Sequence, residues 1–266
     1  MSESAMVGKN SFLNGSLLVA AREIKENLYG VKGSMWAVLS AIVLSLMSYL
    51  LLTDKELSLL DQTEMLYIVT SLSVGLGLLV AGILGGDAVA GERERSTLES
   101  VLLTPVSRGS LVAGKVWAVL AAWLVIFAIS TPYILVVGTG STVSTLALVN
   151  TFVLGTLCVA GFAALVVGLS ALSGSGRSVT LGSLAIFIGM AAPTLLGTAL
   201  QKSWFGSIYN SASPFAQVRL SLDSVIVDKE SLLIQLPHVG ALVAFVALAA
   251  GFAALASRRV SLEGGE

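Results

Sequence analysis

The sequence has few charged residues, one cysteine and one histidine, and each scarcity excludes a class of protein. Aspartate, glutamate, lysine and arginine make up only 12% of the 266 residues, whereas 55% are hydrophobic. Soluble domains carry roughly a quarter charged residues. The formal net charge of -1 provides no basic field for binding nucleic acid. The composition therefore predicts an integral membrane protein without a nucleic-acid partner.

The scarcity of reactive side chains argues against an enzyme with its own active site. Cys158 has no second cysteine for a disulfide or a metal site, so we interpret it as a small core residue. The single histidine, His238, cannot form an H-E-x-x-H zinc pair and is interpreted as an interfacial polar residue, and no G-x-S-x-G occurs. No acidic residue lies inside an expected span, which also argues against a proton-coupled carrier or a selective ion channel. We expect no catalytic residue, no metal and no cofactor bound by this chain.

Uncharged windows predict an all-α membrane protein with six transmembrane helices in one domain, residues 1–266. A charge at the centre of a bilayer costs about 2.5 kcal/mol or more, so spans run between charges. The longest window is interrupted by the turn-rich segment Gly138–Thr145, GTGSTVST, and so contains two spans. The expected spans are Ser34–Leu52, Met65–Gly86, Val116–Val137, Leu146–Leu172, Val179–Leu200 and His238–Ala256.

Lysine and arginine are distributed unequally between the two expected sides of the membrane. Six spans place both termini on one side, and 11 of the 15 lysines and arginines fall there. By the positive-inside rule, the termini and segment 87–115 are cytoplasmic and segment 201–237 is extracytoplasmic. Residues 1–33 form the expected cytoplasmic N-terminus, and the first 30 residues lack a continuous apolar core before a cleavage site, so we expect no cleaved signal peptide.

Two segments outside the spans have amphipathic patterns. Residues 16–29 predict a helix that lies in the membrane interface, with one apolar face formed by Leu17, Ala20, Ala21, Ile24 and Leu28. This helix either only anchors the first span or also contacts a cytoplasmic partner. In segment 201–237, Ser213-Pro214 predicts the start of a short helix that lies at, or dips into, the outer surface.

Segment Asp87–Lys115, DAVAGERERSTLESVLLTPVSRGSLVAGK, contains eight charged residues between two apolar segments. Ser96, Thr97 and Glu99 can open a helix, and Pro105 can end it. The helical spacing of Leu98, Val101 and Leu102 predicts an apolar stripe that is buried against a soluble partner. The alternative is that the charges are only solvated flanks of the spans.

Gly109–Lys115, GSLVAGK, matches the first seven positions of a phosphate-binding P-loop. The eighth position is Val116, where the motif needs a hydroxyl for magnesium, and the match runs into a span. We therefore expect no nucleotide there and interpret Lys115 as a flanking charge at the interface.

The second expected span is rich in glycine. Gly75, Gly82 and Gly86 indicate close helix packing, because small residues let backbones approach each other in lipid. The contact could be either packing within the chain or a dimer seam.

The blocks G-E-R-E-R-x-T-L-E and L-L-T-P-x-S-R, with the six spans, the N-terminal elbow helix and the S-P-F segment, resemble the membrane subunit of a type-two ATP-binding-cassette (ABC) exporter. The resemblance covers nearly the whole chain. It implies a coupling helix at Thr97–Val106 that docks on a separate P-loop ATPase, present in two copies, with ATP and Mg on that partner. It also implies a second permease, a copy or a paralogue, facing this one around a central path in the inner membrane of a prokaryote.

The resemblance implies that the coupling region carries the functional residues. These are Glu92, Arg93, Glu94, Arg95, Thr97, Leu98, Glu99, Val101, Leu102, Thr104, Pro105 and Arg108. The expected function is ATP-driven export of a hydrophobic or amphipathic substrate, such as a lipid, drug or peptide. The alternative is a non-transporting membrane anchor or assembly factor that recruits an ABC-type ATPase for maturation or motility machinery.

Overall fold

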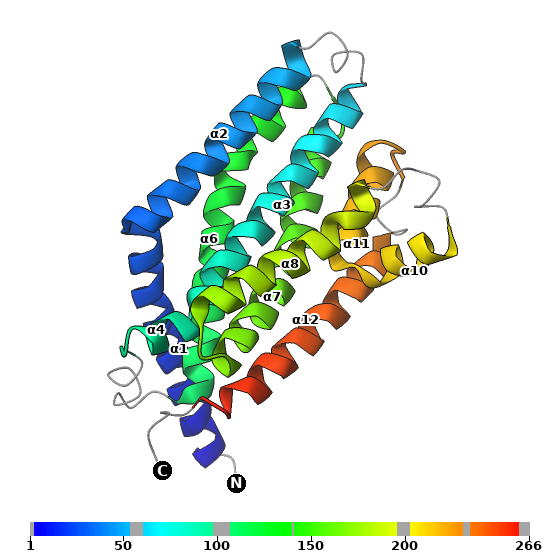
Figure 1. The fold of residues 1–266 in the computed structure, drawn as a ribbon. Coiled ribbons are helices and arrows are strands. Elements are labelled where there is room, and N and C mark those ends of the chain that lie inside the picture. The colour runs from blue at the N-terminus through cyan, green and yellow to red at the C-terminus, as the bar shows by residue number, and fades with distance from the viewer. Residues whose placement is uncertain are drawn as a thin grey trace.

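The computed structural model describes residues 3–53, 61–97, 107–139, 141–195, 203–230 and 235–260. These ranges contain ten helices and no strand. The helices are α1 (Glu3–Tyr29), α2 (Val31–Thr53), α3 (Gln62–Asp87), α4 (Ala90–Glu94), α6 (Arg108–Val137), α7 (Ser144–Leu172), α8 (Gly176–Leu195), α10 (Trp204–Ala212), α11 (Pro214–Ile226) and α12 (Leu236–Ser257). The long helices run side by side, and α1 begins at the end of the bundle where α12 finishes (Figure 1). The all-helical prediction is confirmed for the described residues.

Within the described ranges, five helical stretches are long and apolar enough to cross a membrane. They are Gly33–Thr53, Gln62–Glu94, Arg108–Val137, Ser144–Leu172 and Leu236–Ser257, with mean hydropathies between 2.1 and 2.4. Each contains one of the six expected spans, and the expected division at Gly138–Thr145 is confirmed by the end of α6 and the start of α7. The remaining expected span lies on α8, whose apolar stretch Gly176–Ala192 is shorter, and residues 196–202 lie outside the described ranges. The chain is a multi-pass membrane protein, and the count of six stays a prediction.

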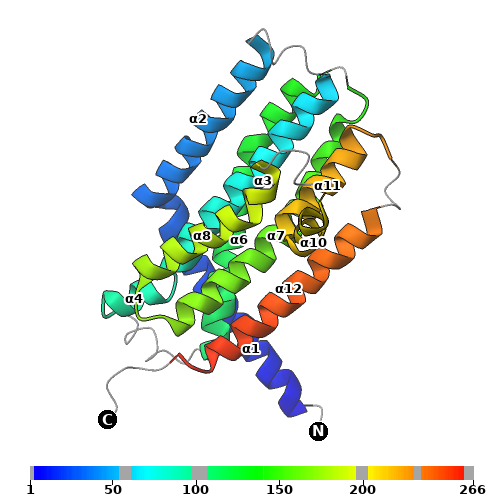
Figure 2. The same cartoon turned by 45° about the vertical axis from the view of Figure 1, so that its right-hand side comes forward.

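Helix α7 lies at the centre and packs against α3, α6, α11 and α12. The fully buried Trp123 of α6 fills the space between glycines of α3 and α7, because a Cβ at Gly77 or Gly155 would meet its indole at 2.3 or 2.7 Å. The indole Nε1 donates to Thr156 Oγ1 at 3.0 Å. Helix α2 lies at the edge of the bundle (Figure 2) and exposes large apolar side chains such as Val38, Ile42 and Leu46.

Helix α11 is the short helix that the sequence predicts at, or dipping into, the outer surface, and one of its faces is buried in the bundle. Ser213 caps α11 as predicted, since its side chain accepts a hydrogen bond from the N–H of Ala216. Val218, Leu222 and Ile226 are fully buried, and α11 packs against α7, α3 and α12. The reason is their i, i+4, i+8 spacing, which forms one apolar face that the bundle covers. Segment 201–237 therefore contributes to the core as well as to the surface.

The helix predicted over residues 16–29 is confirmed as part of α1, but the face that packs on the bundle differs from the predicted apolar face. The face that packs along α6 contains the buried Ser16 and Ala20, while Leu17 remains 61% exposed. Small residues allow this contact, because a Cβ at Gly114 of α6 would lie only 2.7 Å from the Ser16 carbonyl oxygen. Helix α1 thus turns a face that contains the small residues Ser16 and Ala20 toward the bundle and exposes Leu17 outside it; its position in a membrane interface stays a prediction.

Candidate functional site

A bend between α3 and α4 creates the corner from which segment 87–115 leaves the bundle. The N–H of Ala88 still donates to the carbonyl of Gly85 at 3.3 Å, but the N–H groups of Val89 and Ala90 have no helical acceptor, and a side chain from α7 replaces it. The hydroxyl of Ser170 accepts from the N–H groups of Val89 and Ala90 at 3.0 and 2.9 Å and donates to the carbonyl of Gly86 at 2.8 Å. Because Ser170 is fully buried, water cannot substitute for these bonds.

Two arginines fix the short helix α4 against its neighbours. Arg93 donates through Nη1 to the carbonyl of Ser173 at 2.6 Å and through Nη2 to that of Ala171 at 3.3 Å, at the end of α7. Arg95 forms a 2.5 Å ion pair with Asp87, the last residue of α3. The close packing of α4 follows from Gly91, whose Cβ position would lie against the Asp87 carboxylate. Helix α4 is therefore attached to both α3 and α7.

Lys115 lies inside the protein, so its interpretation as a flanking interfacial charge is wrong. Its side chain is 1% exposed, and Nζ lies 2.8 Å from Glu23 Oε1 of α1 and 2.9 Å from Glu92 Oε1 of α4. The two carboxylates are 13% and 14% exposed. The ammonium is buried because two counter-ions from distant parts of the sequence surround it. This cluster, which we call the Lys115 triad, joins α1, α4 and α6.

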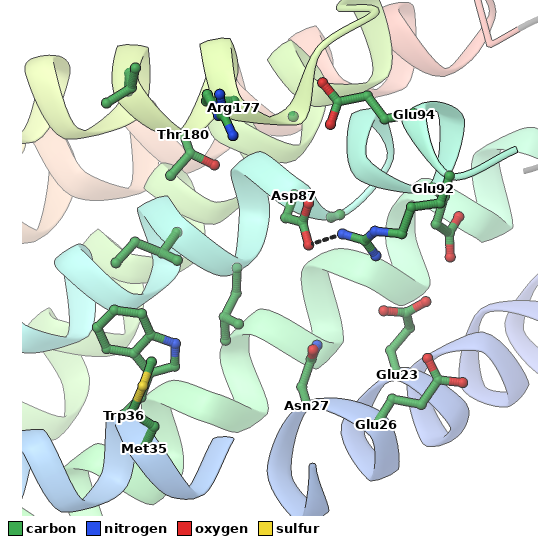
Figure 3. Close-up of a pocket in the computed structure, with 16 residues that line it drawn as sticks. Glu23, Glu26, Asn27, Met35, Trp36, Asp87, Glu92, Glu94, Arg177 and Thr180 are labelled. Carbon is green, nitrogen blue, oxygen red and sulfur yellow. Dashed lines mark hydrogen bonds and ion pairs between the residues drawn. The ribbon is translucent and has the colours of Figure 1, made fainter. Parts of the chain in front are cut away.

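A cleft of about 650 Å³ opens beside the Lys115 triad. Helix α8 supplies Arg177 and Thr180 on one side and α1 supplies Glu23 and Glu26 on the other, with Asp87 between them (Figure 3). Its remaining lining residues are Asn27, Met35, Trp36, Ile83, Leu84, Ala88, Glu92, Glu94, Arg95, Gly176 and Leu181. The cleft thus combines carboxylates with an apolar wall from α2, α3 and α8.

The charges around this cleft are largely paired. Arg22 donates to Glu26 at 2.9 Å, and this hydrogen bond to a carboxylate raises the pKa of the Arg22 guanidinium. Glu23 and Glu92 contact Lys115, and Asp87 contacts Arg95. Among the described residues, no group of three or more histidines, cysteines or acids is arranged to hold a metal ion.

Only part of the predicted coupling region falls within the described residues. Leu98, Glu99, Val101, Leu102, Thr104 and Pro105 lie outside them. Glu92 and Arg93 are directed into the bundle, whereas Glu94 and Arg108 are exposed. Ser96 has a positive φ of 56°, and the N–H of Thr97 donates back to the carbonyl of Glu92 at 3.0 Å. Such a left-handed residue ends a helix, so Ser96 closes α4.

The three glycines of the predicted packing seam lie against helices of the same chain. A Cβ at Gly86 would meet Thr180 of α8 at 2.6 Å, and one at Gly82 would meet Ser183 of α8 at 3.2 Å. Gly75 is less crowded, since the nearest atom, on Phe215, is 3.8 Å away. Ser183 also donates to the carbonyl of Gly82 at 2.9 Å, so Gly82 and Gly86 hold α3 and α8 together.

Sequence reasoning missed the residues that connect the corner to the bundle. Ser170 and Glu23 carry no motif, and their roles depend on which helices become neighbours. Lys115 offered one signal, because it is the last residue of segment 87–115 and is followed by an uncharged stretch. A lysine seven residues inside a helix that starts at Arg108 has to find a counter-ion or reach the interface.

Comparison with known proteins agrees with this architecture. None of the curated proteins compared with the sequence is significantly similar to it. Residues 13–262 match the family model described as ABC-2 family transporter protein. The matched range runs from within α1 to beyond the end of α12. The chain therefore belongs to the ABC-2 transporter family and is a membrane permease of that family.

Proposed function

We propose that the chain is the permease subunit of an ATP-driven exporter, coupled to a separate ATPase through segment 87–115. Permeases of the ABC-2 family generally work with an ABC ATPase. The observation that carries the proposal is the Lys115 triad, which joins the helices on both sides of residues 98–106 to each other and to α1. A docked partner would therefore act on a connected unit.

The contacts around the corner define how a force would spread. Glu92 of α4 holds α6 and α1 through Lys115, while Arg93 holds the end of α7. Ser170 connects α7 to the bend itself. When two ATPase subunits close on ATP, displacement of residues 98–106 would move α3 and α6 together, because both ends of the segment are bonded to the same cluster. This movement would exchange inward and outward access.

The exposed helix faces support a hydrophobic or amphipathic substrate. Helix α2 exposes Val38, Ile42 and Leu46, and α8 exposes Leu181 and Ile188. These helices flank the cleft, whose wall includes Met35 and Trp36. Two permeases that face each other across α2 and α8 would enclose a path with mainly apolar walls. Lipids, hydrophobic drugs or peptides fit such a path better than a bare ion.

The test is the double variant Leu98→Asp/Leu102→Asp, compared with Thr142→Asp. Thr142 is an exposed residue in the turn between α6 and α7, at the opposite end of the bundle from α4, so it controls for an added carboxylate. We expect the double variant to insert normally but to lose co-purification with the ATPase and ATP-dependent flux in vesicles, because carboxylates replace the apolar stripe. Normal co-purification and flux would refute the docking assignment. ATPase binding without flux in the unaltered protein would instead favour a non-transporting anchor.

A further inference from the structure

A second cavity lies at the end of the bundle where α12 begins, between α10, α11 and α12. Its volume is about 490 Å³, within the range of small-molecule sites. The described residues that line it are Ser207, Asn210, Ser211, Gln217, Leu220, Pro237 and His238. None of these seven carries an acidic group, an ammonium or a guanidinium. The cavity is thus polar through hydroxyl, amide and imidazole groups.

Hydrogen bonds fix the α10–α11 junction and the side chain of Gln217 beside this cavity. Ser213 ends α10 and caps α11, and its hydroxyl donates to the carbonyl of Met190 in α8 at 2.9 Å. Gln217, one turn into α11, is only 8% exposed. Its amide nitrogen donates to the carbonyl oxygens of Asn210 and Ser211 at 2.8 and 3.2 Å. Because a carbonyl can only accept, these two bonds fix which end of the Gln217 amide is nitrogen.

The orientation of Gln217 determines the tautomer of His238. The amide oxygen Oε1 of Gln217 lies 2.6 Å from His238 Nδ1 and can only accept a hydrogen bond, so Nδ1 carries the proton. In the neutral ring, Nε2 is then an acceptor, and it has no hydrogen-bond partner within the described part of the chain. The fold therefore presents an acceptor nitrogen in a side chain that lines the cavity.

We propose that this cavity binds a neutral polyhydroxylated group, such as a sugar or a glycerol head group. A ligand hydroxyl can donate to His238 Nε2 and accept from the amide of Asn210, while Ser207 and Ser211 offer further hydroxyl contacts. Leu220 and Pro237 provide apolar surface for the carbon atoms of such a group. An ionic ligand would find no charge of opposite sign among the lining residues described. The site is separate from the α4 end of the bundle, so the inference does not rest on ATPase coupling.

The single histidine makes a direct experiment possible. The full chain is labelled with ¹⁵N-histidine, purified with a histidine-free affinity tag and a zwitterionic detergent, and placed in phosphatidylcholine nanodiscs. The imidazole ¹⁵N resonances then report one site. The two probes are sucrose in solution and a monoglucosyl diacylglycerol in the bilayer, which separate a free saccharide from a lipid head group.

We expect the Nδ1–H tautomer without probe and a saturable displacement of the Nε2 resonance with at least one probe. Asn210→Leu leaves the backbone carbonyl that holds Gln217, removes the side-chain amide, and should weaken binding about tenfold, since a lost hydrogen bond costs on the order of 1.4 kcal/mol. The matched variant Asn27→Leu, in the cleft near α4, should bind normally. An Nε2–H tautomer, no displacement with either probe, or equal binding by Asn210→Leu would overturn the proposal.

Discussion

Replacement of Lys115 by methionine tests whether the Lys115 triad holds α1, α4 and α6 together. Methionine keeps the unbranched shape of the side chain and removes only the ammonium. The carboxylates of Glu23 and Glu92 would remain in place at 13% and 14% exposure without their shared counter-ion. Glu92 Oε2 is already buried without a hydrogen-bond partner among the described residues, so this carboxylate has little other compensation.

The expected cost follows from this burial. Breaking a buried ion pair by removing one partner destabilises a protein by about 3–5 kcal/mol. Because the carboxylates keep some access to solvent, we expect the lower end, about 3 kcal/mol, or roughly a 150-fold change in the unfolding equilibrium. The triple variant Lys115→Met/Glu23→Gln/Glu92→Gln should recover part of this loss, since it leaves no unpaired charge.

Equilibrium unfolding in mixed micelles, followed by the fluorescence of the buried Trp123 and the other tryptophans, measures these differences. The matched control is Arg22→Met, which breaks the Arg22–Glu26 pair, whose side chains are 59% and 58% exposed. An exposed pair of this kind contributes about 0.5 kcal/mol or less. If Lys115→Met were no more destabilising than Arg22→Met, or if the triple variant were less stable than Lys115→Met alone, the role assigned to the triad would be wrong.

Two further substitutions test the corner and the α3–α8 contact. Ser170→Ala should destabilise the protein by about 1–3 kcal/mol in the same assay, because the N–H groups of Val89 and Ala90 lose their acceptor. The control is Ser130→Ala, which should cost less. Ser130 is equally buried, but its hydroxyl bonds only to the Ile126 carbonyl of its own helix. Equal losses would contradict the bridging role of Ser170. Gly86→Ala should lower the melting temperature, because the new Cβ would lie 2.6 to 2.9 Å from side-chain and backbone atoms of Thr180. The control Gly75→Ala should be tolerated, because its Cβ would lie 3.8 Å from the nearest atom, on Phe215. A tolerated Gly86→Ala would mean that α3 and α8 are not in close contact.

Much of the fold was predictable from local patterns. Charged residues mark the ends of spans because of the cost of burying them, and the Gly138–Thr145 turn and the Ser213 cap depend on residues close in sequence. The burial of Lys115 was not predictable in this way, since Glu23 lies 92 positions away. For a similar reason, the sequence left open whether α11 lies at the surface or dips inward. An amphipathic stripe indicates that one face is covered but not whether lipid or protein covers it.

The hydroxyl group of Ser170 both accepts and donates the hydrogen bonds that stabilise the α3–α4 bend. It belongs to α7, which follows later in the chain. Without Ser170, residues Gln62–Glu94 could continue as one helical stretch of 33 residues. At 1.5 Å per residue such a helix would be about 50 Å long, well beyond the roughly 30 Å hydrocarbon thickness of a bilayer. The bend therefore takes its hydrogen-bond partner from α7. During synthesis, the corner would form only after most of the bundle is in the membrane, so an incompletely inserted chain would not yet present the surface at which we propose that an ATPase docks.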